Sequence, residues 1–164
     1  MDVVDSKTRS RMMSGIRSSG TTPEQAVRGL MHRHGFRYRL NDASLPGKPD
    51  MVFRKYSAVV FVHGCFWHAH DCRLFKLPSS RADFWSKKLE QNVSRDLRVI
   101  RELVRQGFRV AVVWECATRK IDNHEALAKV LGHWLKSFDA KYIEIRDAGT
   151  NSGVSIRKST ARAI

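Results

Sequence analysis

Cysteine and histidine side chains gather between residues 65 and 72 in a pattern that suits a metal ion. Cys65, His70 and Cys72 form a C-x4-H-x-C pattern after an apolar run, and Cys116 follows a second apolar run. Thiolates and imidazoles are ligands of tetrahedral zinc, and a structural zinc site needs four. Cys116 supplies the fourth if the two runs are neighbouring strands. His68 is an alternative to His70, and inert buried thiols are an alternative to any metal site.

A carboxylate and two histidines also lie near one another in the sequence. Pro49-Asp50 precedes one strand-like segment, and His63 and His68 follow the next. Hydrolysis of a phosphodiester needs a carboxylate to hold Mg²⁺ and a base to activate water, and Asp50, His63, His68 and the Val62 carbonyl could build that site. The Pro-Asp pair resembles the restriction-endonuclease core, although the second acid and the lysine of that motif are absent. Ordinary strand capping and structural hydrogen bonds are the alternatives.

Large aromatic side chains interrupt this polar segment. Phe66-Trp67 lies directly before His68, and Trp85 follows near the start of a helical pattern. Flat rings among polar residues can stack on bases or wedge between them. The alternative is that Phe66 and Trp67 pack against the loop of the cysteine and histidine cluster, and that Trp85 belongs to the apolar face of the helix. Met13, on a basic N-terminal segment, could enter a DNA groove, or the segment could be a solvated arm.

Charge and composition narrow the class of protein. The 164 residues hold 30 Lys and Arg against 16 Asp and Glu, a formal net charge of +14. This excess favours a polyanionic partner, nucleic acid before an anionic membrane. No apolar run approaches the roughly 20 residues of a membrane span, and the N-terminus lacks an apolar signal core. Three cysteines, an odd number, favour a reduced cytoplasm over a disulfide framework.

The order of periodic segments predicts the elements that must position these side chains. We expect a mixed α/β sheet with helices on both faces. Capping residues predict three helix starts, namely Thr22 with Gln25, Asp83 and Asp122. From Asp147 onward the chain is rich in Gly, Ser, Thr and Arg and is expected to fray. The strands are expected at residues 36–40, 51–53, 57–62, 108–114 and, as an edge strand, 142–145.

Several segments, in order, resemble the very short patch repair (Vsr) DNA mismatch endonucleases. They read DSKTRSRMM, LPGKPD, FVHGCFWHAHDC, FWSKKLEQNVSRD and VVWEC, and the resemblance runs from about Asp5 to about Leu135. It implies a restriction-endonuclease-like mixed β-sheet flanked by helices, with a structural zinc site. It also implies a Mg²⁺-dependent enzyme that nicks one strand 5′ to the thymine of a T:G mismatch, the product of 5-methylcytosine deamination.

The resemblance also implies roles for single residues. Asp50 and the backbone carbonyl of Val62 would bind Mg²⁺, His68 would be the catalytic base, His63 would assist at the scissile phosphate, and Glu24 would lie in the active-site region. Relatives carry threonine where this chain has Val62, which leaves the backbone ligand intact. The implied zinc ligands are Cys65, His70, Cys72 and Cys116. The implied DNA-binding residues are Phe66, Trp67 and Trp85 from the major groove, and Met13 and Lys88 from the minor groove.

The expected organisation is an N-terminal DNA-contacting arm at residues 1–20, an endonuclease domain at 21–146 and a flexible tail at 147–164. The expected partner is double-stranded DNA with a T:G mismatch, with mismatch-repair proteins as further partners and no membrane. The chain is expected to be a monomer in the bacterial cytoplasm, associated with the nucleoid. Two alternatives are a related nicking nuclease with another DNA target, for example in host defence, and a non-catalytic zinc-stabilised DNA-binding protein.

Overall fold

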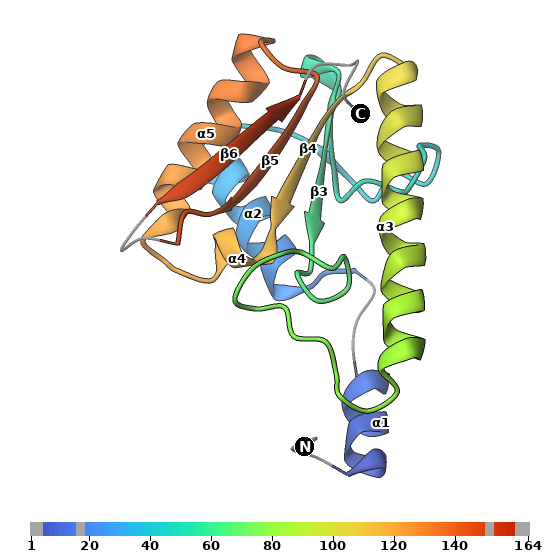
Figure 1. Cartoon of the computed structure of the whole chain (residues 1–164). Helices are drawn as coiled ribbons and strands as arrows, with labels where there is room; N and C mark the ends of the chain where they lie inside the picture. Colours follow the sequence, from blue (N-terminus) through green and yellow to red (C-terminus); the bar gives the residue numbers. More distant parts are fainter. Residues whose placement is uncertain (1–4, 16–18, 150–152, 160–164) are drawn as a thin grey trace.

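A six-stranded mixed sheet forms the centre of the protein, with strand order β1-β2-β3-β4-β5-β6 (Figure 1). The computed structural model describes residues 5–15, 19–149 and 153–159. Strands β3, β4 and β5 are parallel, and the other neighbouring pairs are antiparallel. The strands are β1 (Arg39–Leu40), β2 (Met51–Phe53), β3 (Ala58–His63), β4 (Arg109–Trp114), β5 (Tyr142–Asp147) and β6 (Val154–Ser159).

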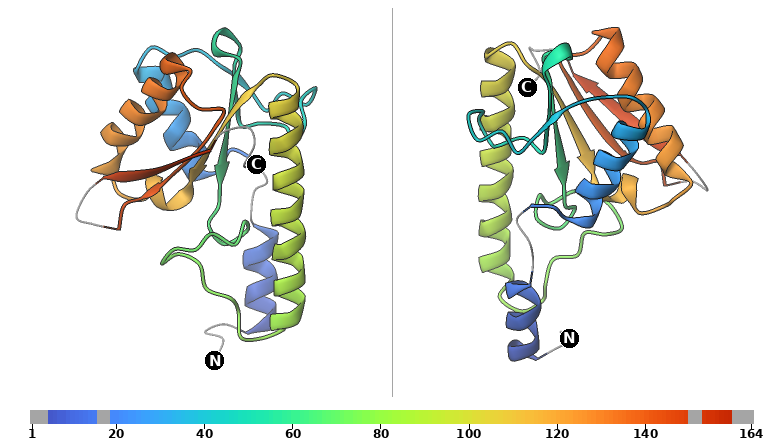
Figure 2. Two further views of the ribbon diagram at one scale, coloured as in Figure 1. Left: turned by 45° about the horizontal axis from the view of Figure 1, so that its top comes forward. Right: turned by 180° about the vertical axis from the view of Figure 1, so that it is seen from behind.

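Helices cover both faces of this sheet, as Figure 2 shows from two further directions. The helices of the described residues are α1 (Ser6–Ser14), which lies beyond the start of α3 and off the sheet, α2 (Thr22–Arg33), α3 (Ala82–Arg105), α4 (Glu115–Thr118) and α5 (Asn123–Ser137), with a 3-10 turn at Arg54–Tyr56. The mixed α/β sheet flanked by helices that the sequence predicts is confirmed. Within the described residues, no helix combines the length and apolarity that a membrane crossing requires.

The central strands are buried on both sides, which explains their continuous apolar sequences. All six residues of β3 and all six of β4 are buried. Because side chains alternate along a strand, Val60 and Ala111 face the core shared with α2 and α5, whereas Val59 and Val112 face the core shared with α3. The sheet is therefore a rigid platform, and side chains at its strand ends are held in place.

Parallel pairing brings the ends of β3 and β4 to one edge of the sheet. Val62 pairs with Val113 and His63 with Trp114, in register. The loop at residues 64–81 leaves from the end of β3, and α4 begins at Glu115, directly after β4. The expectation that the two apolar runs are neighbouring strands is thus confirmed.

Predicted helix starts differ from the observed ones by a residue or two. Thr21, not Thr22, is the N-cap of α2, and its side chain accepts a hydrogen bond from the backbone of Glu24. Glu24 takes the capping-box position, because its carboxylate accepts the N–H of Gly20, while the side-chain amide of Gln25 donates to the Gly20 carbonyl. A capping box can be placed at either of two adjacent threonines, and the carboxylate is the stronger acceptor.

Two further helix starts also needed the structure. Helix α3 begins at Ala82, after Arg81 in a left-handed conformation with φ 54°, so Asp83 is a first-turn residue rather than the cap. Asp122 is the N-cap of α5, but its side chain makes no capping hydrogen bond. The αR backbone of Asp122 does not have the extended conformation in which a side chain usually caps.

The first strand is shorter than predicted, and an additional strand lies at the opposite edge of the sheet. Strand β1 covers only residues 39–40, because Phe36 turns into the core, where it contacts Phe53 and Tyr56. Strand β5 is internal, since β6 pairs with it from Tyr142 to Asp147. Residues 154–159 lie in the segment expected to fray, but they form β6, which pairs with the preceding strand as an antiparallel hairpin.

Candidate active site and metal-binding cluster

A cavity of about 380 Å³ lies at the end of β3, where the loop at residues 64–81 begins. The sequence-predicted acid and imidazole residues come together there, although they arise from four separate elements of the fold. α2, the loop before β2, strand β3 with the loop after it, and α3 each supply part of the lining. The functional side chains that line it are Glu24, Asp50, His63, His68 and Asp96, beside the backbone of Val62.

Asp50 is held by the strand that it faces. Its carboxylate accepts the backbone N–H of Val62 at 2.7 Å. Burial raises the pKa of Asp50 to about 6; the Val62 hydrogen bond opposes this rise, and the negative charge of Glu24 adds to it. Two carboxylates that share a partly desolvated cavity favour a bound cation, and oxygen donors suit Mg²⁺. The residues present thus fit a hard divalent cation.

Glu24 is a buried carboxylate with partners on both oxygens. Its side chain accepts hydrogen bonds from the N–H of Gly20 at 2.8 Å and from the hydroxyl of Thr21 at 3.0 Å. Arg28, one helical turn away, forms an ion pair with it at 2.9 Å. The N-terminus of α2 also favours negative charge at this position. Glu24 is therefore held in place by partners on both oxygens, and its charge acts on Asp50.

His68 is paired with a carboxylate that the sequence analysis did not single out. Its Nδ1 forms a short hydrogen bond with Asp96 on α3. Burial raises the pKa of Asp96, but the His68 hydrogen bond and nearby positive charges outweigh burial and lower the pKa overall. An ionised Asp96 keeps the proton of His68 on Nδ1 and leaves Nε2 as a proton acceptor. Only the packing of α3 against the loop brings these residues together, 28 positions apart.

His63 is a buried, neutral imidazole. Burial, followed by the charge of His68, lowers its pKa to about 3. Its ring stacks on the ring of His68 and meets Trp114 edge-on. His63 therefore carries no positive charge at physiological pH, and it can act only as a neutral hydrogen-bonding group.

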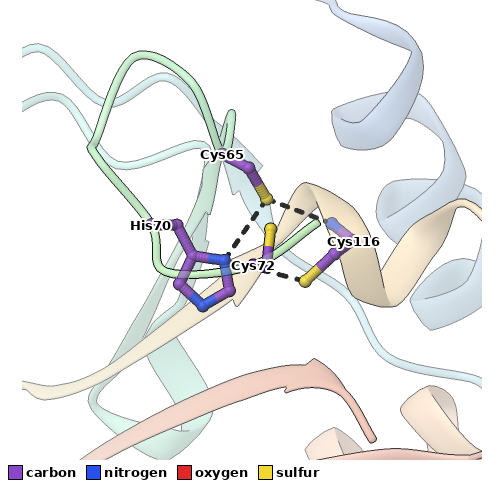
Figure 3. Close-up of side chains that lie close together, drawn as sticks. All are labelled: Cys65, His70, Cys72 and Cys116. Atoms are coloured by element: carbon purple, nitrogen blue, oxygen red, sulfur yellow. Dashed lines mark hydrogen bonds between the residues drawn. The ribbon is translucent and has the colours of Figure 1, made fainter. Parts of the chain in front are cut away.

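A second cluster, beside the cavity, joins Cys65, His70, Cys72 and Cys116, whose ligand atoms all lie within 4.8 Å of one another (Figure 3). The Nδ1 of His70 lies 3.4 Å from the sulfur of Cys65 and 3.8 Å from that of Cys116. These spacings and the three-sulfur, one-nitrogen donor set fit a tetrahedral metal ion. His70, and not His68, belongs to this cluster, because the Nδ1 of His68 faces Asp96.

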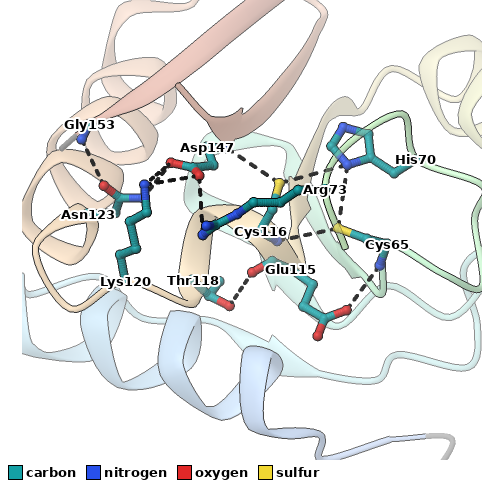
Figure 4. A network of polar contacts seen from close by, with 10 residues as sticks. All are labelled: Cys65, His70, Arg73, Glu115, Cys116, Thr118, Lys120, Asn123, Asp147 and Gly153. Atoms are coloured by element: carbon teal, nitrogen blue, oxygen red, sulfur yellow. Dashed lines mark hydrogen bonds and ion pairs between the residues drawn. The ribbon is translucent and has the colours of Figure 1, made fainter. Parts of the chain in front are cut away.

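Neighbouring elements anchor the cluster (Figure 4). Glu115, the first residue of α4, accepts the N–H of Cys65 at 3.1 Å and forms an ion pair with Arg119. The N–H of Asp147 in β5 points at the sulfur of Cys116 at 3.4 Å. Backbone N–H groups directed at thiolates stabilise their negative charge. The cluster thus connects the loop after β3 to both α4 and β5.

The predicted DNA-contacting aromatics form one exposed group. Phe66 lies 5.1 Å from Trp67 and 5.4 Å from Trp85, measured between ring centroids, and all three rings are partly exposed. The side chain of Asn92 donates to the carbonyl of Trp67 at 2.9 Å, which ties this loop to α3. The predicted Lys88 is exposed on the same helix. The side chain of Met13 lies outside the part of the chain that the structure describes.

A mixed sheet that brings carboxylates and imidazoles to one cavity, beside a Cys-His cluster, defines an α/β phosphodiester hydrolase. The family model described as DNA mismatch endonuclease Vsr matches residues 1–74. The type II nicking enzyme V.XorIIP of Xanthomonas oryzae pv. oryzae is 48% identical over 125 residues, 76% of this chain and 92% of that protein. The DNA mismatch endonuclease Vsr of Escherichia coli is 46% identical over 136 residues, 82% of this chain and 87% of that protein. The chain belongs to the Vsr family of DNA mismatch endonucleases.

Proposed function

We propose that this protein nicks one strand of duplex DNA 5′ to the thymine of a T:G mismatch, in a reaction that requires Mg²⁺. One observation carries the proposal: the cavity that holds Asp50, His63 and His68 adjoins the loop that exposes Phe66 and Trp67. A hydrolytic site and a group of stacking side chains are thus parts of one surface. The names of the relatives, a mismatch endonuclease and nicking enzymes, support the same activity.

The oxygen ligands of the proposed magnesium ion are the Asp50 carboxylate and the Val62 carbonyl. Glu24 adds a fixed negative charge close by. When bound, Mg²⁺ neutralises charge on the phosphate and stabilises the leaving oxygen. Asp50 would hold the ion as a carboxylate, since protonation of this side chain competes with metal binding.

His68 is the proposed general base. With Nδ1 occupied by Asp96, its Nε2 can accept the proton of the attacking water. Asp96 stabilises the imidazolium that results and thereby acts as a positioning residue. His63, neutral and stacked on His68, is proposed to contact the scissile phosphate as a hydrogen-bond donor.

Recognition of the mismatch is assigned to the aromatic group. Phe66, Trp67 and Trp85 would wedge into the base stack from the major groove, which costs a few kcal/mol per step. A T:G wobble pair stacks less well than a matched pair, so the cost is lower at the mismatch. Met13 and Lys88 would contact the minor groove, with residues 1–20 as the arm that reaches it. The net charge of +14 supplies non-specific affinity.

The Cys-His cluster is proposed to hold a structural zinc ion through Cys65, His70, Cys72 and Cys116. The two proposed wedges, Phe66 and Trp67, lie in the chain between the first two of these ligands. A closed four-ligand site would hold the loop rigid, so that wedging into DNA does not have to order it first. The protein is further proposed to act as a cytoplasmic monomer at the nucleoid, alongside mismatch-repair proteins.

A strand-specific nicking assay tests the proposed function. Duplexes labelled on each strand would carry T:G, another mismatch or a matched pair, with and without Mg²⁺. We expect one nick, 5′ to the thymine, only with T:G and Mg²⁺. Equal nicking of all duplexes would favour the alternative of a nuclease with another DNA target. Binding without any metal-dependent nicking would favour a non-catalytic DNA-binding protein.

A further inference from the structure

The acidic side chains of the cavity would repel the proposed substrate, because a phosphodiester is an anion. Three carboxylates line the cavity, those of Glu24, Asp50 and Asp96. His63 is buried, and its ring stacks on the ring of His68 rather than lying at the mouth of the cavity. The sequence lacks the lysine of the restriction-endonuclease motif, because residue 63 and its neighbours read Phe61-Val62-His63-Gly64. A phosphodiester that enters needs positive charge from other side chains besides a metal ion.

One such cation is Lys48, on the wall formed by the loop before Asp50. Lys48 is exposed, lines the cavity, and has a left-handed backbone with φ 50°. The preceding Gly47 packs so closely on α3 that a Cβ there would lie 2.4 Å from a methyl carbon of Val99. This contact holds the loop against α3, so the backbone of Lys48 is held beside the cavity that its side chain lines.

The second cation is Arg95, on the part of the lining that α3 forms. Its guanidinium lies 3.7 Å from one oxygen of Asp96, whose other oxygen binds His68. The side chain is 56% exposed, so this contact leaves donors free at the mouth. Among the residues that the structure describes, Arg28 also lies close to the acids, but it is paired with Glu24 and does not line the cavity.

We propose that Lys48 and Arg95 bind the non-bridging oxygens of the phosphodiester in this cavity, as a clamp that takes the place of the missing motif lysine. This inference rests on the proposed nuclease function. A lysine and an arginine that come from two elements lining one cavity can contact the same phosphate and hold it in line with the attacking water.

The test removes the charge of Lys48 or Arg95 from the protein, removes the charge of the scissile phosphate from the DNA, and compares the effects alone and together. Lys48→Gln and Arg95→Gln should each slow single-turnover nicking on the order of 100-fold at saturating enzyme, without a change in melting temperature. Without Mg²⁺, binding would be measured to a T:G duplex and to the same duplex with a neutral methylphosphonate at the scissile position. The neutral linkage should lower the DNA affinity of the wild type. The same linkage should lower the affinity of either variant by a clearly smaller factor.

Two variants serve as matched controls. Lys55→Gln removes an exposed lysine from the turn between β2 and β3, and Arg101→Gln removes an exposed arginine further along α3. Neither residue lines the cavity, so both should nick at the wild-type rate. The inference is overturned if Lys48→Gln and Arg95→Gln nick normally, or if the methylphosphonate weakens them as much as the wild type. A wild type that binds but never nicks would instead refute the proposed function.

Discussion

The imidazole rings of His63 and His68 stack face to face, with 3.8 Å between their centroids and 4° between their planes. One ring belongs to the end of a buried strand and the other to the loop that follows it. Burial, with the charge of His68 beside it, lowers the pKa of His63 to about 3, so His63 is neutral near neutral pH. Asp96 lies against the Nδ1 of His68 and orients that ring.

Replacing Asp50 by asparagine should abolish nicking and spare binding. The amide keeps the shape of the side chain and can still accept the N–H of Val62, but it removes the charged metal ligand. We expect single-turnover nicking to fall by at least about 1000-fold. Mismatch affinity measured without metal should stay within a few-fold of the wild type. Asp42→Asn, at a carboxylate that instead pairs with Arg54, is the matched control and should nick normally.

Asp96→Asn tests whether a positioning carboxylate supports His68. An amide cannot hold the Nδ1 proton of His68 as an anion does, so the fraction of rings with Nε2 free to act as base should fall. We expect nicking to slow by roughly 100- to 10,000-fold with unchanged DNA affinity. Asp83→Asn, on an exposed carboxylate in the first turn of the same helix, should have no effect. Equal rates for the two variants would contradict the pairing.

Acid should destabilise the fold through His63. Its pKa of about 3 lies below its ordinary value of 6.5, so between these values the unfolded chain binds a proton that the folded protein excludes. The stabilisation is complete above pH 6.5 and is lost as the pH falls, by up to about 1.4 kcal/mol per pH unit. Urea unfolding from pH 7.5 to 4.5 should show a steeper loss for the wild type than for His63→Gln. If the unfolding free energies of the wild type and His63→Gln fall in parallel with pH, the role of His63 is contradicted. The control His133→Gln, at an exposed site, should follow the wild type.

Metal analysis tests the proposed zinc site. The chain has three cysteines, and all three belong to the cluster. Purified protein should contain close to one zinc ion per chain, and a thiol reagent should react with none of the cysteines until a chelator removes the metal. Removal should lower the unfolding free energy by several kcal/mol. Cys116→Ser should lose zinc; Ser57→Ala, outside the cluster, should keep it.

Trp67→Ala should reduce mismatch preference more than overall affinity. Stacking of one aromatic ring on a base contributes about 1–3 kcal/mol, so the ratio of T:G to matched affinity should fall about tenfold or more. Fluorescence anisotropy with both duplexes measures this ratio. Phe138→Ala removes a ring that is 61% exposed at the end of α5, and its ratio should not change. A Trp67→Ala protein that weakens equally on both duplexes would contradict the wedge.

Local sequence patterns were sufficient to predict the platform of the fold. The apolar runs that became β3 and β4 predicted buried parallel strands, because a strand covered on both faces needs no polar side chain. From that pairing followed the expectation that Cys116 joins Cys65. Strand β6 was missed, since the Gly-, Ser- and Thr-rich segment before it led us to expect fraying, whereas Val154 to Ser159 pair with β5 as a hairpin.

The sequence by itself determined which residue types could do chemistry: Asp50, the two histidines, three thiols and the exposed aromatics. Only the tertiary structure decided which of them meet. Asp96 on α3 and Lys48 in a loop carry no local signal, and they reach the cavity because α3 packs along β3 and against Gly47. Periodicity reports which side of an element faces the core, whereas distances between side chains of separate elements depend on how those elements pack.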